Sequence, residues 1–203
     1  PLAPTSSNSC TGLVKPHDSS CRLTAMQADD VIRSERLDLP LLSLDQLDHL
    51  AAGEGASVGA DLRAILPIPW LDEVRWLAGM RAQQLRLRPD DAPWLLRPIL
   101  LRTTEGALQA IGYLNFHAGP DDRGMVEVGY TLLPDARGQG YAIEAVRAAF
   151  DWATSVHGIH VFRASVAPDN ERSLNLIGKL GFRQTGEQWD AEDGLELVFE
   201  LER

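Results

Sequence analysis

The sequence predicts a single α/β (α+β) domain with a mixed, mostly antiparallel sheet of six to seven strands, flanked by about four helices. Three observations support this. Segments with strand-like alternation are interspersed with segments of helical spacing. The 203 residues, 44% of them hydrophobic and 24% charged, suffice for one sizeable core. A glycine-rich run, residues 137–142, joins an apolar strand to an amphipathic helix, an arrangement suited to binding an anion at a helix N-terminus.

The N-terminal segment differs in composition from the rest of the chain. Residues 1–25 are rich in Ser, Thr, Pro and Asn and lack apolar periodicity. We therefore expect residues 1–33 to form a flexible extension and residues 34–203 to form the domain. Met26 opens a run that resembles a natural protein start, so we expect the residues before it to be non-native.

The first half of the domain alternates between strand and helix patterns. Leu37, Leu39 and Leu41 predict a strand, and Ser43 is a suitable cap for the helical pattern that follows over residues 44–50. We expect a break at residues 53–59, a rigid loop at 66–70 and a second helix at 71–87. Strands are expected at residues 94–101, 108–117 and 125–133.

The second half begins with the helix that follows the glycine-rich run. Ile143, Val146, Ala149, Phe150 and Ala153 recur at helical spacing, and Gly158 is a suitable C-cap. The remaining expected elements are a strand at residues 159–166, a short helix at 173–180, and strands at 182–189 and 195–201.

Composition argues against several classes of protein. A formal charge of −10 disfavours nucleic-acid binding and mildly favours cationic partners such as amines. No apolar run approaches the roughly 20 residues that span a bilayer, and no secretory signal is visible. We therefore expect a cytoplasmic protein with no membrane partner. Cys10 and Cys21 lie in the polar N-terminal segment and are expected to be free thiols, and His157 and His160 lack further ligands, so no metal is expected.

The run Arg137-Gly138-Gln139-Gly140-Tyr141-Ala142 resembles the pyrophosphate-binding signature of the GCN5-related N-acetyltransferase (GNAT) family. Three further runs resemble the branch of ribosomal-protein alanine N-acetyltransferases (RimJ/RimL-like). They are Ser34-Glu35-Arg36-Leu37, Glu127-Val128-Gly129-Tyr130, and Asn170-Glu171-Arg172-Ser173 followed by Lys179-Leu180-Gly181-Phe182. The order of the expected elements is also similar to the GNAT fold, whose sheet is splayed at the cofactor site.

The resemblance implies acetyl-CoA as co-substrate. In GNAT proteins the helix after the glycine-rich loop cradles the pyrophosphate, and the end of the preceding strand bonds to the pantetheine arm. The residues implied to contact the cofactor are Leu132, Leu133, Arg137, Gly138, Gln139, Gly140, Tyr141, Ala142 and Asn170. Because the chain is acidic and coenzyme A is polyanionic, we expect attraction to be local, from backbone N–H groups and from Arg137, Arg172 or Lys179.

Acetyl transfer to an amine requires a base to remove a proton. Glu127 occupies the place where many GNAT proteins carry their general base. If residue pairs of the hairpin sum to about 242, Asn115 lies opposite Glu127 and His117 opposite Met125, so Tyr113, Asn115 and His117 share the face of Glu127. His117 is an alternative base, since its unperturbed pKa lies near neutrality.

The general acid is less clear from the sequence. Many GNAT enzymes carry a tyrosine seven positions after the Asn of the last helix, where this chain has Ile177. The branch resemblance implies Ser173 for this role. A water molecule and a purely capping role for Ser173 remain alternatives.

Substrate specificity in this fold comes mainly from two loops, here residues 53–70 and 189–194. They supply Trp70 and Trp189 as candidate substrate contacts, together with the acidic Asp190, Glu192 and Asp193. The expected acceptor is a protein or peptide N-terminus or a small-molecule amine, and a homodimer is left open. The alternative function is a non-catalytic acyl-CoA sensor or interaction module on the same fold.

Overall fold

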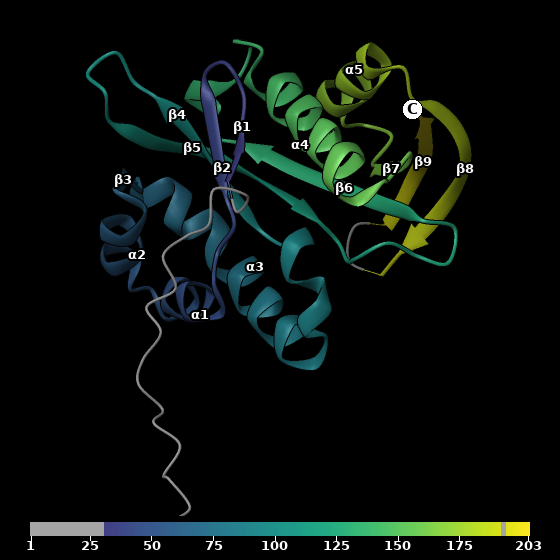
Figure 1. The fold of residues 1–203 in the computed structure, drawn as a ribbon. Helices are drawn as coiled ribbons and strands as arrows, with labels where there is room; N and C mark the ends of the chain where they lie inside the picture. Colours follow the sequence, from purple (N-terminus) through teal and green to yellow (C-terminus); the bar gives the residue numbers. More distant parts are fainter. Residues whose placement is uncertain (1–30, 192–193) are drawn as a thin grey trace, which may run out of the picture.

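The computed structural model describes residues 31–191 and 194–203, which form a mixed α/β structure (Figure 1). Their single sheet has nine strands in the order β1-β2-β4-β5-β6-β7-β9-β8, with β3 beside β5. The strands are β1 Val31–Arg33, β2 Leu37–Pro40, β3 Ala64–Ile65, β4 Arg97–Arg102, β5 Leu108–Phe116, β6 Met125–Leu132, β7 Val161–Val166, β8 Arg183–Asp190 and β9 Gly194–Glu202. The α-helices are α1 Leu44–Ala52, α2 Gly55–Leu62, α3 Ile68–Leu87, α4 Tyr141–His157 and α5 Glu171–Leu180, and two 3₁₀ turns cover Pro89–Trp94 and Pro134–Ala136.

The mixed, mostly antiparallel sheet confirms the predicted fold class, although several boundaries were wrong. Val31–Arg33 were assigned to the flexible extension but form β1, which pairs with β2. Residues 53–59 were expected to be a break. These residues contain a tight turn at Gly53 and the beginning of α2. The many small residues of α2 obscure its two buried apolar residues, Val58 and Leu62, in the sequence pattern. The expected flexible extension before residue 31, and the natural protein start expected at Met26, lie outside the described residues.

Two core clusters lie on opposite faces of the sheet. One packs α4 and α5 against the central strands and includes Val126, Val128, Phe150 and Ile177. The other packs α1, α2 and α3 against β4 and β5 and is centred on Trp70. Figure 1 shows α1, α2 and α3 gathered beside β2, β4 and β5, while α4 lies across the middle of the sheet, against β1, β2 and β6, and α5 lies beside β7. The strands β7, β8 and β9 are therefore not covered by α1, α2 and α3.

The register of the hairpin formed by β5 and β6 differs from the expected one by two residues. Asn115 pairs with Gly129, and the N–H of His117 donates to the carbonyl of Glu127 at 3.0 Å. The turn is centred later than expected because the carboxylate of Asp121 accepts the backbone N–H groups of Arg123 and Met125. A shift of two residues preserves the faces of both strands, so Tyr113, Asn115 and His117 still share the face of Glu127.

The strands β6 and β7 diverge. They pair in parallel only from Met125–Val161 to Glu127–Arg163, although β6 continues to Leu132 and β7 to Val166. After Glu127, β6 remains paired with β5 along one edge, and its other edge no longer pairs with β7. This divergence leaves one edge of β6 without a strand partner over residues 128–131, and the carbonyl of Leu132 accepts Nε of Arg137 at 2.9 Å.

Candidate active site

The entrance of α4 is built to present backbone N–H groups. Gly138 and Gly140 have φ of +77° and +83°, a conformation that L side chains rarely adopt. Gly140 is the N-cap, and no side chain caps the helix. The N–H groups of Tyr141, Ala142 and Ile143 therefore lie in the first turn without intrahelical partners, at the positive end of the helix dipole. Such a helix entrance suits a phosphate group.

A cavity of about 670 Å³ opens beside this helix entrance. Three cationic side chains line it, those of Arg137, Arg172 and Lys179, and none of its described lining residues is acidic. It is bounded by the end of β6, the glycine-rich loop, and the first turns of α4 and α5. The remaining lining residues are Tyr130, Thr131, Leu132, Gly138, Gly140, Tyr141, Ala142, Ile143, Asn170, Ser173, Asn175 and Leu176.

Most residues expected at the cofactor line this cavity, but two do not. The side chain of Leu133 packs against the second core cluster, and its N–H donates to the carbonyl of Ile111 at 2.8 Å. The side-chain amide of Gln139 donates to the carbonyl of Asp135 at 3.2 Å and thereby bridges the glycine-rich loop. Leu133 and Gln139 thus shape the loop from outside the cavity. The resemblance implied cofactor contact for both residues, and for Leu133 this contact was expected from the backbone.

The fit to a coenzyme A group rests on three features of this region. The helix entrance and the cations suit the phosphates, and the unpaired edge of β6 suits the amides of an extended arm. Asn170 caps α5, where its Oδ1 accepts the N–H of Ser173 at 3.2 Å, and it thereby positions Ser173 at the wall of the cavity. The residues present are therefore compatible with an acetyl-CoA site.

A charged pair ties the start of the domain to the helix entrance. The carboxylate of Glu144 accepts the Ser34 hydroxyl at 2.7 Å, and the backbone N–H and Nε of Arg36 at 2.8 and 2.7 Å. The Arg36 guanidinium also donates to the carbonyl of Gln139 at 3.2 Å and lies 4.4 Å from the centroid of the Tyr141 ring. Burial raises the pKa of Glu144, but the bonds from Ser34 and Arg36 outweigh it, and the net pKa lies below its ordinary value. The Ser34–Leu37 motif thus has a structural role that its sequence does not reveal.

Glu127 lies on the opposite face of β6 from Val126 and Val128. Its Oε1 accepts the Ser165 hydroxyl at 2.6 Å and lies 4.0 Å from Nδ1 of His117. The amide of Gln188 donates to Ser165 Oγ at 3.2 Å and to Glu196 Oε2 at 2.9 Å. Partial burial lowers the pKa of His117, with Glu127 acting in the opposite direction, so the ring is neutral near pH 7. A neutral imidazole beside a carboxylate can accept a proton.

Gly129 makes room for this pair. A Cβ atom at Gly129 would lie 3.0 Å from Nε2 of His117, closer than normal packing allows. The glycine in the Glu127–Tyr130 motif is therefore explained by the approach of the imidazole to the strand.

Three supporting residues were missed by sequence reasoning: Arg81, Gln84 and Asp91. The buried Arg81 donates from Nε to Asn115 Oδ1 at 2.9 Å and from a terminal nitrogen to the His117 carbonyl at 3.1 Å. Gln84 donates to the same carbonyl at 3.0 Å and to Asp91 at 2.6 Å. These bonds hold the end of β5. The available signal was that Arg81 follows Trp70, Val74, Leu77 and Ala78 on the apolar stripe of α3.

Two of the four expected substrate contacts are buried, and a third lies on the other face from Glu127. Trp70 is fully buried and donates from Nε1 to the Gly112 carbonyl at 2.7 Å, so it is a core residue. Asn115 is 3% exposed, and its side-chain oxygen already accepts a hydrogen bond from Arg81. Trp189 is exposed, but its neighbour Gln188 points to Ser165, so alternation along β8 directs Trp189 to the other face. Tyr113 shares the face of Glu127 and is half-buried.

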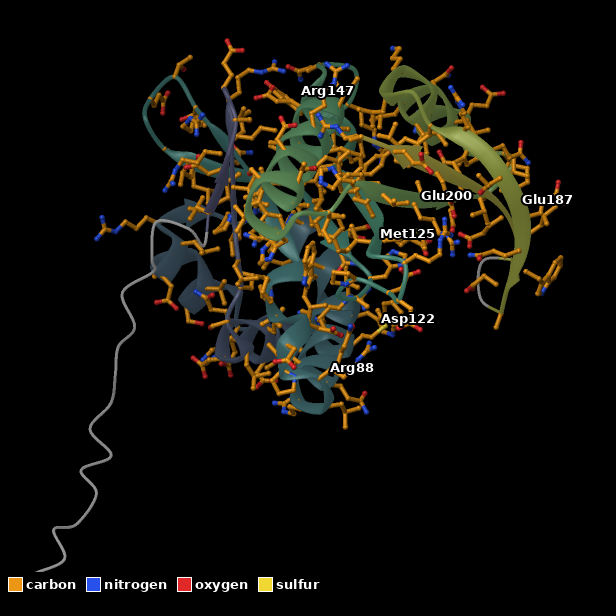
Figure 2. The ribbon with its side chains drawn as sticks, turned by 45° about the vertical axis from the view of Figure 1, so that its right-hand side comes forward. Arg88, Asp122, Met125, Arg147, Glu187 and Glu200 are labelled. Carbon is orange, nitrogen blue, oxygen red and sulfur yellow. The ribbon has the colours of Figure 1, made fainter. Side chains whose placement is uncertain are left out.

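The face of the sheet that carries Glu127 has a second ionic group. Glu200 lies 3.1 Å from both Arg123 and Arg163, and these two side chains lower its pKa below the ordinary value. Figure 2 shows Glu200 on the inner side of β8 and Glu187 on its outer side. The expected acidic loop is only partly described, because Glu192 and Asp193 lie outside the described residues.

Comparison with known proteins establishes the family. The sequence model described as "Acetyltransferase (GNAT) domain" matches residues 41–183. The chain therefore belongs to the GNAT family of acetyltransferases. It is 32% identical over 74 residues to the "Uncharacterized N-acetyltransferase YjdG" of Bacillus subtilis, a match covering 36% of this chain and 44% of YjdG. The chain spans less than half the length of the curated relatives that it matches.

Solved structures share the fold. The Microcin C7 self immunity acetyltransferase MccE, in complex with acetyl-CoA and AMP, aligns with a TM-score of 0.60 at 12% identity, covering 88% of this chain and 98% of MccE. RimL, the ribosomal L7/L12 alpha-N-protein acetyltransferase in complex with coenzyme A, aligns with a TM-score of 0.56 at 18% identity, covering 85% of this chain and 97% of RimL. At these identities the likeness concerns the fold alone.

No helix within residues 31–191 and 194–203 combines the length and the apolar character that a membrane span requires. Within the same ranges, no group of three or more His, Cys, Asp and Glu side chains could hold a metal ion.

Proposed function

We propose that this protein transfers the acetyl group of acetyl-CoA to a primary amine by direct attack of the amine in a ternary complex. The observation that carries the proposal is the position of strand β6 between two sites. Its last residues line the cationic cavity, and its Glu127 lies on the other face beside His117. The cofactor and the amine can thus approach one strand from its two sides.

Different residues bind the cofactor, orient it and accept the proton. The helix entrance and the three cations bind the phosphates of the cofactor, and the free edge of β6 orients its arm. Acetyl-CoA supplies the activated acetyl thioester. His117 and Glu127 accept the proton that the amine must lose, with Ser165 and Gln188 holding the carboxylate in place.

The charge of the acceptor side favours a cationic amine. On this side, hydrogen bonds through Ser165 and Gln188 connect the carboxylates of Glu127 and Glu196. Neither carboxylate forms an ion pair with Arg or Lys among the described contacts. An ammonium group is attracted to such a site, and it releases one proton to solvent before the neutral amine attacks. RimL is described as an alpha-N-protein acetyltransferase and MccE as an immunity acetyltransferase bound to AMP, so both a peptide N-terminus and a small-molecule amine are candidate acceptors.

The test combines binding with turnover on the full chain. Isothermal titration with acetyl-CoA and with desulpho-CoA measures cofactor binding, and thiol release is then followed across a panel of amines and short peptides. Gly138→Glu places a carboxylate at the helix entrance and is expected to abolish cofactor binding. Glu127→Gln is expected to lower thiol release by about 100-fold or more while cofactor binding persists.

Glu187→Gln is the matched control. It makes the same chemical change at an exposed carboxylate on the outer side of β8 and is expected to alter neither quantity. Binding without thiol release on any acceptor would favour the alternative, a non-catalytic acyl-CoA sensor. Absence of cofactor binding in the unsubstituted protein would overturn both.

A further inference from the structure

Tyr130 carries a buried hydroxyl that the proposed proton transfers do not use. It lies on β6 three residues beyond Glu127, where the pairing with β7 has ended. Its ring lines the cationic cavity and packs against the first core cluster. Its hydroxyl oxygen is inaccessible to solvent and forms no hydrogen bond of normal geometry with any described residue. Leaving a buried hydroxyl unpaired costs about 1–3 kcal/mol, so it needs an explanation.

Ser173 is the described polar side chain that acts on this hydroxyl. Ser173 lies in the first turn of α5, lines the same cavity and is half-buried, so it is accessible from the cavity while the Tyr130 oxygen is not. Burial raises the pKa of Tyr130, and the Ser173 hydroxyl acts against that effect by stabilising the phenolate. Tyr130 and Ser173 therefore line the same cavity, with the Tyr130 oxygen shielded from solvent.

The chain lacks the usual source of a proton on α5. Position 177 holds an isoleucine that is 2% exposed and belongs to the core. Ser173 is the hydroxyl at the cavity wall of α5, but an aliphatic hydroxyl is a much weaker acid than a phenol. A serine that gives up a proton would become a strongly basic alkoxide unless a second donor restores the proton.

We propose that the Tyr130 hydroxyl donates a hydrogen bond to Ser173 Oγ in the cofactor complex and resupplies the proton that Ser173 gives to the departing thiolate. Tyr130 is thus a positioning residue that acts through Ser173. This inference rests on the proposed acetyl transfer.

The proton and electron movements balance. The amine nitrogen forms a bond to the thioester carbonyl carbon and loses one proton to the His117–Glu127 pair. The carbon–sulfur bond breaks, and the sulfur leaves with the bonding electron pair. It takes the proton of Ser173, which takes the proton of Tyr130, and solvent reprotonates the phenolate when the products leave. The products are the acetylated amine and the free thiol.

Tyr130→Phe tests the proposal without threatening the fold, because it removes only a hydroxyl that lacks a normal partner. We expect thiol release to fall about 30-fold or more, while the dissociation constant for acetyl-CoA changes less than about threefold. Ser173→Ala should cause a similar loss, and the double variant should lose little more than either single variant, because the two residues act as one unit. Ser155→Ala, which removes an exposed hydroxyl of α4 outside the cavity, is the control.

An equilibrium measurement separates this role from a structural one. Coenzyme A bound to the protein is titrated by the ultraviolet absorbance of its thiolate. A proton-donating Tyr130–Ser173 pair stabilises that thiolate, so Tyr130→Phe should lower the acid dissociation constant of the bound thiol about tenfold. The same variant should weaken coenzyme A binding at alkaline pH while leaving desulpho-CoA binding unchanged.

The outcomes are distinct. An active protein in which Tyr130→Phe changes neither thiol release nor the bound thiol's dissociation constant would overturn the role of Tyr130 and leave the proposed transferase intact. Additive losses in the double variant would also overturn it. If the unsubstituted protein binds coenzyme A but acetylates no tested amine, the thiolate titration still decides. If it binds no coenzyme A, the proposed function and this inference both fail.

Discussion

Nδ1 of His117 lies 4.0 Å from Oε1 of Glu127, at the point where the two central strands begin to diverge. Each partner is held from a different part of the chain. The carbonyl of His117 accepts bonds from Arg81 and Gln84 of α3, and the carboxylate of Glu127 accepts the hydroxyl of Ser165 from β7. The pair is therefore supported by groups from both halves of the sheet.

The low-pH limb of the reaction should report the imidazole. Partial burial lowers the pKa of His117 below its ordinary value of 6.5, so the neutral, proton-accepting form prevails above that pH. We expect kcat/KM to rise with pH through an apparent pKa below 6.5 and then to level off. His117→Gln should remove this limb and lower kcat/KM about 10- to 100-fold. Steady-state kinetics from pH 5 to 8 checks this; a limb that survives the substitution would assign the base to Glu127 alone.

Enlarging Gly129 should disturb the same pair without affecting the cofactor cavity. In Gly129→Ala the new Cβ would lie 3.0 Å from Nε2 of His117, so the imidazole must move. We expect kcat to fall about tenfold, with the dissociation constant for acetyl-CoA nearly unchanged, because small displacements of reacting groups are costly. Gly186→Ala, where a Cβ meets nothing within 4 Å and φ is not positive, is the matched control. An equal loss of acetyl-CoA affinity would contradict the assignment.

The pairing of Arg36 with Glu144 should stabilise both the domain and the helix entrance. Arg36→Ala leaves the carboxylate of Glu144 without its guanidinium partner, and we expect the free energy of unfolding to fall by about 1–3 kcal/mol. The KM for acetyl-CoA should rise, because Arg36 also holds the carbonyl of Gln139. Urea unfolding and steady-state kinetics measure the two effects.

The pH dependence of stability offers a control on this pair. The pKa of Glu144 is lower in the folded protein than its ordinary value of 4.5. Its stabilising contribution is therefore present above pH 4.5 and is lost as the pH falls through the folded pKa. In Arg36→Ala this contribution should shrink. An unchanged acid dependence would mean that Ser34 and the backbone N–H of Arg36 hold the carboxylate without the guanidinium.

Two glycine substitutions should have opposite effects on stability. Gly138→Ala forces a side chain into a backbone with φ of +77°, so we expect a loss of about 1 kcal/mol and weaker binding of acetyl-CoA. Gly178→Ala lies inside α5 with no atom within 4 Å of the new Cβ, and we expect a gain of about 0.5–1 kcal/mol with no change in binding. Thermal unfolding with and without acetyl-CoA measures both, and destabilisation by Gly178→Ala would be the contrary result.

The elements that sequence analysis found have local causes. The helix after residue 140 was predicted because its apolar residues recur at helical spacing, and Ser43 and Gly158 cap their helices in the structure as their residue types indicate. The elements it missed depend on distant partners. The short strands β1 and β3 exist because β2 and β5 offer them edges. The helix α2 consists largely of small residues, and its buried residues are Gly55, Val58 and Leu62.

The candidate site shows the same division. The helix entrance at Gly138 and Gly140 is a local feature, set by backbone conformations that glycine adopts without strain, and the sequence by itself determined it together with the faces of β6. The tertiary structure decided that His117 lies beside Glu127, that Trp70 and Asn115 are buried, and that Tyr130 and Ser173 line one cavity. These relations join segments 10 to 45 residues apart and depend on strand register and helix packing, so residue type and local spacing contain no record of them.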